Sequence, residues 1–334
     1  SKDTMSKNPS TTDAFGPADP KYLDLRWGDP VFMQPYWKSR NNDITVLSGS
    51  HMGYSSAGGL ERLKKSIVEL HDSVGNAETK DYHVVVGAGA SQILQAALYA
   101  LKDKVTGVEF QPPYFPRFGT FATLIGLDWN DASKNAVEII TSPNNPDGKL
   151  MVSQFNEQYQ IYDYCYNWPQ YLDKPIKGNQ DIMVFSLAKA TGHAATRIGW
   201  ALVKDKALAQ DMEHYIELST SGVSYEAQAY AASVIRSQLI DFNGTCFKHG
   251  QDKLARRWET IKEAFKNKQD IKLLNTNGMF LWCESESTDA SKYMQDKYGI
   301  NAVGGQHFGC ITSMFRMNLG CGIEDFEKLL EKLK

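Results

Sequence analysis

The chain has 334 residues, 42% of them hydrophobic and 22% charged, a balance typical of a globular protein long enough for a large core and two lobes. Its net charge of −3 gives no reason to expect nucleic acid or an anionic membrane surface as a partner. No apolar stretch is long enough to span a bilayer, and residues 1–20 are polar and turn-rich without the apolar core of a signal peptide.

The middle of the chain alternates short apolar stretches with helical periodicity. Strands are predicted over 83–86, 105–110, 137–141, 159–162, 182–185 and 198–203, with helices over 90–102 and 117–125. This alternation predicts an α/β domain with a mainly parallel central sheet. Ligands of such sheets bind at the carboxyl ends of the strands, so site residues should fall just after strands.

The pattern changes after residue 222. Long helices are predicted over 225–239 and 254–266, short strands near 279–283 and 313–319, and a closing helix over 323–334. The segment before residue 48 is irregular and aromatic over 20–37, and we expect it to pack with this later part. The sequence therefore predicts a large domain of residues 48–222 and a smaller α+β domain of residues 1–47 and 223–334.

The cysteines are few, and their spacing includes no Cys-x-x-Cys pair. They are Cys165, Cys246, Cys283, Cys310 and Cys321. The odd count favours reduced thiols over a disulfide framework, so we expect a cytoplasmic protein, and no metal site is predicted.

The segment from Phe185 to Arg197 carries the strongest functional signal. Lys189 lies just past the predicted strand 182–185, three residues after Ser186 and eight before Arg197. Its amine can form a Schiff base with an aldehyde, while the serine hydroxyl and the guanidinium can bind a phosphate. Pyridoxal phosphate (PLP) offers both groups. For this segment alone a surface lysine near a glycine turn is an equal interpretation, so the PLP hypothesis depends on the other strand ends.

A glycine-rich turn, Gly87-Ala88-Gly89-Ala90-Ser91-Gln92, follows the predicted strand 83–86 and opens a helix. Backbone N–H groups at a helix start bind anions. The turn lacks the third glycine of the dinucleotide fingerprint and the Gly-Lys-Ser/Thr ending of an NTPase loop. For this motif alone, an ordinary tight turn and a phosphate-binding turn are equally good interpretations. Together with Ser186, Lys189 and Arg197, the phosphate-binding turn is the better one.

Two further strand ends carry polar side chains suited to a pyridine ring. Asn145, in a turn after the strand 137–141, can donate to the phenolic oxygen of PLP, although Asn-Pro and Asp-Gly form turns in any case. Asp163, directly after the strand 159–162, can pair with the ring nitrogen and make the ring an electron sink. Tyr166 can donate a second hydrogen bond to the phenolic oxygen. A helix cap and a core aromatic are the alternatives for Asp163 and Tyr166.

An aromatic loop and a lone arginine complete the set. One aromatic residue of the loop 113–118 can stack on the pyridine face, with core packing as an equally economical alternative. Arg316 lies inside the apolar strand 313–319, and a buried arginine needs an anion. A substrate carboxylate and an internal salt bridge satisfy that need equally well.

With these residues the chain resembles the fold-type I PLP-dependent aminotransferases. More narrowly, it is similar to the branch that holds the plant tryptophan–pyruvate aminotransferases and the alliinase C-S lyases. The resemblance runs from about residue 25 to the C-terminus, and its most specific segments are 145–148, 163–169 and 189–200, with 28–30 and 74–77 matching as well.

The resemblance implies a role for each matching position. Lys189 would carry the internal aldimine and move the proton, Asp163 would pair with the ring nitrogen, and Asn145 and Tyr166 would bind the phenolic oxygen. The remaining roles concern the phosphate, ring stacking, the substrate carboxylate and a second subunit: Ser186, Arg197 and Gly89-Ala90-Ser91 for the phosphate, Phe115 (or else Tyr114) for stacking, Arg316 with Asn145 and Gly28 for the α-carboxylate, and Tyr54 for the phosphate of the neighbouring subunit in a homodimer.

The reaction that the resemblance implies is transamination of an α-amino acid to its 2-oxo acid. An aromatic or large apolar donor fits the branch and the aromatic residues Trp27, Tyr36 and Trp37, which are expected near the entrance. β-Elimination by a C-S lyase is the alternative, because both reactions share their first carbanion. The cysteine-rich N-terminal module of the alliinases does not occur in the sequence, which puts a secreted lyase in doubt. A third hypothesis is a non-catalytic binding protein with the PLP fold. The presence of Lys189, Asp163 and Arg197 argues against it.

Overall fold

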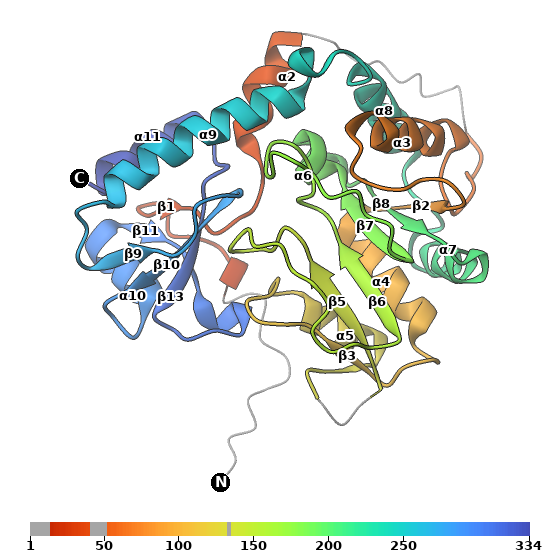
Figure 1. Cartoon of the computed structure of the whole chain (residues 1–334), viewed down its shortest axis with the longest axis horizontal. Coiled ribbons are helices and arrows are strands. Elements are labelled where there is room, and N and C mark those ends of the chain that lie inside the picture. Colours follow the sequence, from red (N-terminus) through yellow and green to blue (C-terminus); the bar gives the residue numbers. More distant parts are fainter. Residues whose placement is uncertain (1–13, 41–51, 132–134) are drawn as a thin grey trace.

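The computed structural model describes residues 14–40, 52–131 and 135–334, which form two lobes, each around its own sheet (Figure 1). The larger sheet has seven strands in the spatial order β2 (His83–Gly87), β8 (Gly199–Val203), β7 (Ile182–Ser186), β6 (Tyr159–Asp163), β5 (Ala136–Thr141), β3 (Gly107–Glu109) and β4 (Asp128–Trp129). Only β8 runs against its neighbours; the other strands pair in parallel or lie parallel across it.

Alternate residues of the central strands enter different cores, because side chains of a strand point to opposite faces in turn. Val85 and Val184 pack on one face of the sheet, and Val86 and Phe185 pack on the other. The first face is covered by α4 (Gly89–Leu101), α5 (Phe118–Ile125) and α7 (Lys206–Thr220). The second is covered by α3 (Glu61–Val74), α6 (Leu187–Thr191), α8 (Tyr225–Ser237) and α9 (Cys246–Phe265). Both faces of the sheet are therefore buried, as a mainly parallel sheet requires.

The smaller lobe is built around an antiparallel sheet from the C-terminal part of the chain. Its strands lie in the order β12 (Val303–Gly304), β13 (Met314–Asn318), β10 (Phe280–Ser285) and β9 (Ile271–Leu273). A separate parallel pair joins β1 (Leu23–Asp24) to β11 (Ile300–Asn301), which ties the N-terminal segment to this lobe. The remaining elements are α2 (Gln34–Arg40), α10 (Ala290–Tyr293), α11 (Ile323–Lys332), the 3₁₀ turns η1 (Val31–Met33), η2 (Ala194–Thr196), η3 (Phe242–Gly244) and η5 (Gly305–Phe308), and the π-helical turn η4 (Met294–Tyr298).

The α/β class and the mainly parallel sheet are confirmed, and several boundaries differ from the prediction. The helix predicted over 254–266 begins eight residues earlier, at Cys246, because the Thr245 hydroxyl accepts a hydrogen bond from the backbone N–H of Lys248 and caps the helix there. The segment predicted as irregular over 20–37 contains β1, η1 and the start of α2. The domain limits at 47/48 and 222/223 stay predictions, and the first lies outside the described residues.

Candidate active site

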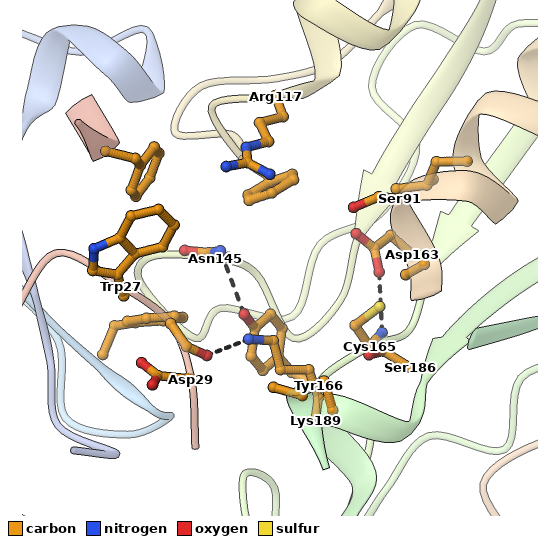
Figure 2. A pocket seen from close by; sticks show the side chains of 18 of the residues that line it. Trp27, Asp29, Ser91, Arg117, Asn145, Asp163, Cys165, Tyr166, Ser186 and Lys189 are labelled. Carbon is orange, nitrogen blue, oxygen red and sulfur yellow. Dashed lines mark hydrogen bonds between the residues drawn. The ribbon is translucent and has the colours of Figure 1, made fainter. Parts of the chain in front are cut away.

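A cavity of about 400 Å³ opens at the carboxyl edge of the large sheet, where the smaller lobe faces it. That volume is in the range of small-molecule sites. Residues from five strand ends of the large sheet meet there with residues of the N-terminal segment and of the second sheet (Figure 2). The residues that line it are Phe15, Trp27, Gly28, Asp29, Ala90, Ser91, Leu94, Phe115, Arg117, Asn145, Asp163, Cys165, Tyr166, Ser186, Ala188, Lys189, Ala194, Arg197, Phe280 and Arg316.

Lys189 projects into this cavity from the short helix α6, which begins directly after β7. Its backbone carbonyl accepts hydrogen bonds from the Tyr171 hydroxyl at 2.7 Å and the Gln170 amide at 3.1 Å, which fixes the turn. Its Nζ donates to the carbonyl oxygen of Gly28. Burial lowers the pKa of the amine to about 8, and the positive charge of Arg316 acts in the same direction. A fraction of the amine is therefore neutral, and nucleophilic, near neutral pH.

Asp163 is the last residue of β6 rather than the residue after it, and its carboxylate is buried. One carboxylate oxygen accepts the backbone N–H of Cys165 at 3.1 Å. Burial raises the pKa of the carboxyl group, and hydrogen bonds from Cys165 oppose that shift. No basic side chain of the described residues forms an ion pair with it. A buried carboxylate in this state is suited to a cationic partner such as a protonated pyridine nitrogen.

Asn145, Tyr166 and Arg316 form a hydrogen-bonded chain across the cavity. The Arg316 Nη1 donates to Asn145 Oδ1 at 2.9 Å, and the Asn145 amide nitrogen lies 3.5 Å from the Tyr166 hydroxyl. Nη2 of Arg316 donates to the carbonyl oxygen of Arg26 at 2.7 Å. The pKa of Tyr166 is raised well above its usual value by burial. The Tyr166 hydroxyl is therefore a neutral hydrogen-bond donor over the physiological pH range.

Arg316 is buried without a carboxylate partner among the described residues. Its guanidinium carbon lies 4.1 Å from the ring centroid of Phe280 and 5.1 Å from that of Phe308, and its Nε has no hydrogen-bond partner. Burial lowers its pKa to about 10, so the group remains charged at neutral pH. An internal salt bridge was one of the two alternatives for Arg316 in the sequence, and none occurs among the described residues. An anion bound in the cavity would supply the missing partner of the arginine.

The opposite end of the cavity is a small polar cup. Ser186 ends β7, Ala90 and Ser91 open α4, and Arg197 precedes β8. Because β8 is antiparallel, its first residue lies at the same edge of the sheet as the last residues of β2 and β7. Gly89 has a φ of +79°, and a Cβ there would lie 2.2 Å from Nη2 of Arg197. The cup thus combines a guanidinium, two hydroxyls and helix-start N–H groups around a backbone conformation that favours glycine at position 89, and this donor set fits a phosphate.

The remaining predicted residues divide between the cavity and other surroundings. Phe115 and Gly28 line the cavity. Tyr114 does not; its ring packs against Phe110 at 4.6 Å between centroids. Tyr54 is 93% exposed and does not line the cavity.

The expected entrance aromatics also divide. Trp27 lines the cavity. Tyr36 and Trp37 do not, because α2 turns their polar groups toward the carbonyl oxygens of Gly244 and Thr191, respectively.

Sequence reasoning missed several lining residues, above all Phe15, Arg117, Cys165 and Phe280. Arg117 lies two residues after Phe115, and Cys165 two after Asp163, so their neighbourhood could have been noticed. Phe15 and Phe280 carry no such signal because they reach the cavity only through the packing of the smaller lobe. In the described ranges, no group of three or more metal-binding side chains occurs, and no helix could cross a membrane.

Comparison with known proteins identifies the family to which the chain is similar. The family model described as allinase (Alliinase_C) matches residues 23–334. Tryptophan aminotransferase-related protein 2 of Arabidopsis thaliana is 34% identical over 346 residues, covering 90% of this chain and 78% of its own length. An alliin lyase of Allium cepa var. aggregatum is 28% identical over 362 residues, covering 93% of this chain and 80% of its own length.

Solved structures show the same fold at low sequence identity. An Escherichia coli protein with a methionine aminotransferase function superposes with a TM-score of 0.73 at 15% identity, over 94% of this chain and 93% of the other. The aspartate aminotransferase of Rhizobium meliloti gives 0.73 at 17% identity, over 93% of this chain and 90% of its own.

Proposed function

The chain belongs to the allinase family of fold-type I PLP enzymes, and from that premise we propose that it is an aminotransferase that converts an aromatic or large apolar α-amino acid to its 2-oxo acid. Membership of this family indicates a PLP-dependent aminotransferase or an alliinase-like lyase. The observation that carries the proposed PLP chemistry is the buried amine of Lys189, with a pKa of about 8, in one cavity with Asp163, Arg316 and the polar cup.

PLP, when bound, supplies an aldehyde for the amine and an aromatic ring that withdraws electrons from the substrate α-carbon. In the proposed arrangement Ser91, Ser186 and Arg197 hold its phosphate and Phe115 lies against its ring. Asp163 holds a proton on the ring nitrogen, and Asn145 and Tyr166 donate toward the phenolic oxygen. These roles agree with the donor set, since the buried Asp163 carboxylate needs a cation and Tyr166 stays protonated.

Lys189 is the proposed catalytic base. With PLP and substrate bound, its Nζ would take the proton from the substrate α-carbon and hold it for return. The Gly28 carbonyl oxygen, which accepts a hydrogen bond from Nζ, keeps the amine pointed into the cavity. Arg316, oriented by Asn145 and by the Arg26 carbonyl oxygen, binds the substrate α-carboxylate. Arg316 is itself buried, and burial strengthens its attraction for an anion.

An aromatic donor is proposed from the walls and from the relatives. Phe15, Trp27 and Phe280 line the cavity. Phe280 lies against Arg316, and Phe15 and Trp27 pack on each other with ring centroids 5.1 Å apart. Large rings gain from such surfaces through buried area and ring–ring contact. Several of the relatives carry the name tryptophan aminotransferase-related protein.

A C-S lyase is the second candidate, favoured by the alliin lyases among the relatives. It shares the base and the cofactor residues, because both reactions begin by removing the α-proton. The products separate the two. A transaminase without an acceptor forms one equivalent of 2-oxo acid per site and stops, whereas a lyase continues to release pyruvate and ammonia.

The deciding experiment incubates the PLP-loaded enzyme with a panel of amino acids and no 2-oxo acid. We expect a single equivalent of product, with aromatic donors reacting fastest. Lys189→Ala should lower the rate at least about 1,000-fold, since both the amine that binds the aldehyde and the base are lost. Lys174→Ala removes an exposed lysine outside the cavity and is the matched control. Normal turnover by Lys189→Ala, or PLP binding with no reaction of any amino acid, would overturn the proposal.

A homodimer belongs to the same proposal. Tyr54 is almost fully exposed, and Arg197, which lines the polar cup, is exposed as well. A second copy that brought its Tyr54 to this cup would bury both and add a hydroxyl to the phosphate ligands. Sedimentation of the PLP-loaded protein, with Tyr54→Phe tested for PLP retention, checks this assignment.

A further inference from the structure

The helix that carries Lys189 is too short to satisfy its own backbone. α6 has only five residues, and the last four C=O groups of an α-helix have no partner within the helix. The backbone N–H of Gly192 returns to the Ala188 carbonyl oxygen at 3.0 Å. The carbonyl oxygens of Lys189, Ala190 and Thr191 accept hydrogen bonds from side chains of other segments instead.

Gln170 and Tyr171, in the loop after β6, hold the first two of these carbonyl groups. The Gln170 amide nitrogen donates to the Lys189 carbonyl oxygen at 3.1 Å and to that of Ala190 at 2.8 Å. The Tyr171 hydroxyl donates to the Lys189 carbonyl oxygen at 2.7 Å. Both side chains are buried, and burial raises the pKa of Tyr171, so its hydroxyl keeps the proton that it donates. The Lys189 carbonyl group is therefore held by two buried donors, and losing both would be costly.

Trp37 holds the third carbonyl group from the N-terminal segment. Its Nε1 donates to the Thr191 carbonyl oxygen at 2.7 Å. The same segment supplies the Gly28 carbonyl oxygen, which accepts a hydrogen bond from Nζ of Lys189. Both the backbone and the amine of Lys189 are therefore placed by segments that are distant from it in the sequence.

Tyr171 also contacts the proposed cofactor site. Its ring meets that of Tyr166 edge to face, with centroids 5.5 Å apart. Nζ of Lys189 lies 5.6 Å from the Tyr166 ring centroid, and Figure 2 shows these two side chains next to each other in the cavity. Tyr171 thus contacts both a proposed ligand of the phenolic oxygen and the backbone of the residue proposed to bind the aldehyde.

We propose that Gln170, Tyr171 and Trp37 are positioning residues, a carbonyl clamp that sets where the Lys189 amine lies relative to the cofactor. None of the three lines the cavity, so each acts through the turn of Lys189 and not by touching a bound molecule. The inference rests on the proposed joining of Lys189 to the PLP aldehyde, which transamination and β-elimination share. Reactions between bound groups depend steeply on their placement, so a small shift of the turn is enough to slow them.

The test compares two cofactor forms that fit the same polar cup but differ in their need for Lys189. PLP joins the lysine through its aldehyde, whereas pyridoxamine phosphate carries an amine in that position and cannot. Fluorescence titration of the PLP-free protein gives both dissociation constants for the wild type, Tyr171→Phe and Gln170→Met. We expect each variant to weaken PLP binding about threefold to tenfold, the range of one hydrogen bond, and pyridoxamine phosphate binding less than about twofold.

A double variant tests whether the two donors serve one carbonyl group. Each single variant leaves the Lys189 carbonyl oxygen with its other donor, whereas Tyr171→Phe combined with Gln170→Met leaves it with neither. The loss of PLP affinity in the double variant should therefore exceed the product of the two single losses, by about tenfold. A double loss equal to that product would contradict the clamp.

Tyr164→Phe is the matched control for Tyr171→Phe. Tyr164 is a buried tyrosine of the same loop, and its hydroxyl donates to Gln180 Oε1 at the same 2.7 Å without lining the cavity. We expect both cofactor forms to bind this variant as they bind the wild type. Trp37→Phe, which keeps a ring but removes the N–H donor, is the second test variant if the loop variants do not fold.

Three results would overturn the clamp. Equal losses for PLP and pyridoxamine phosphate would mean that its residues only support the fold around the cup. Unchanged binding of both forms in every variant would remove the positioning role. An equal loss of PLP affinity in Tyr164→Phe would mean that any buried hydroxyl has the same effect.

The binding comparison needs no amino acid, so it gives the same answer for a transaminase and for a lyase. Reduction with borohydride separates its failure from that of the proposed function. A wild type in which borohydride fixes no PLP to Lys189 would contradict the role of the lysine itself. A wild type that is labelled at Lys189, with a preference for PLP that Tyr171→Phe and Gln170→Met both keep, would contradict the clamp alone.

Discussion

The two ends of the active-site cavity are built from different parts of the chain. The polar cup and the Asp163–Lys189 region come from consecutive strand ends of one sheet, within residues 83–203. The end that contains Trp27, Phe280 and Arg316 is assembled from the N-terminal segment and from the second sheet. The geometry of the first end depends on the large sheet alone, while that of the second end depends on how the smaller lobe packs against the large sheet. The proposed cofactor chemistry is therefore separated from substrate selection, and substitutions at the two ends should fail in different ways.

Asp163→Asn should have the largest effect at the cofactor end. The amide cannot neutralise a protonated ring nitrogen, so we expect kcat to fall about 100- to 1,000-fold with every donor. Glu138, a buried carboxylate of the neighbouring strand β5 that binds Ser153 and Gln154 instead of lining the cavity, supplies the control Glu138→Gln. If kcat falls equally for every donor in Asp163→Asn while Glu138→Gln keeps its activity, the effect is local to the active site.

Arg316→Gln tests the substrate end. We expect KM for every amino acid and 2-oxo acid to rise about 100-fold while PLP remains bound, because every substrate carries the α-carboxylate. Spectroscopic titration of bound PLP alongside steady-state kinetics measures both quantities. Loss of PLP together with substrate affinity would mean that the two ends are not separable.

Gly89→Ala should weaken the cup alone. The new Cβ would meet the Arg197 guanidinium at 2.2 Å in a backbone conformation that costs roughly 1–2 kcal/mol for a residue other than glycine. We expect about tenfold weaker PLP binding, measured on the apoprotein, with little change in KM once the enzyme is saturated. Gly75→Ala, at a helix end with a similar φ of +75° but no neighbouring atom within 4 Å, controls for the strain.

The smallest effect concerns pH and Lys189 in the PLP-free protein. The folded pKa of about 8 lies below the usual 10.5, so between these values the unfolded chain binds more protons and stability rises with pH. Below about pH 8 the buried amine is charged, and Lys189→Met should be the more stable protein, by about 3 kcal/mol. The gap should close from pH 8 toward 10.5. Urea denaturation at several pH values measures it, and a gap independent of pH would contradict the lowered pKa.

Much of the fold and of the cofactor end could be predicted because the signals are local. A short apolar stretch followed by a polar residue places that residue at a strand end, and parallel strands bring their ends together. Lys189, Asp163, Asn145 and Ser186 were all found this way, and the family comparison agrees with the PLP enzyme that they imply. Their individual roles remain predictions.

The sequence by itself determined the α/β class, the edge of the sheet at which the site lies, and the polar groups that gather there, because each follows from spacing along one strand and turn. Only the tertiary structure separated Phe115 from Tyr114, excluded Tyr36 and Trp37 from the cavity, and brought Phe15, Arg117 and Phe280 to it. Those outcomes depend on which side of a loop faces the second lobe, a matter of packing between segments more than a hundred residues apart. No periodicity within a single segment encodes it.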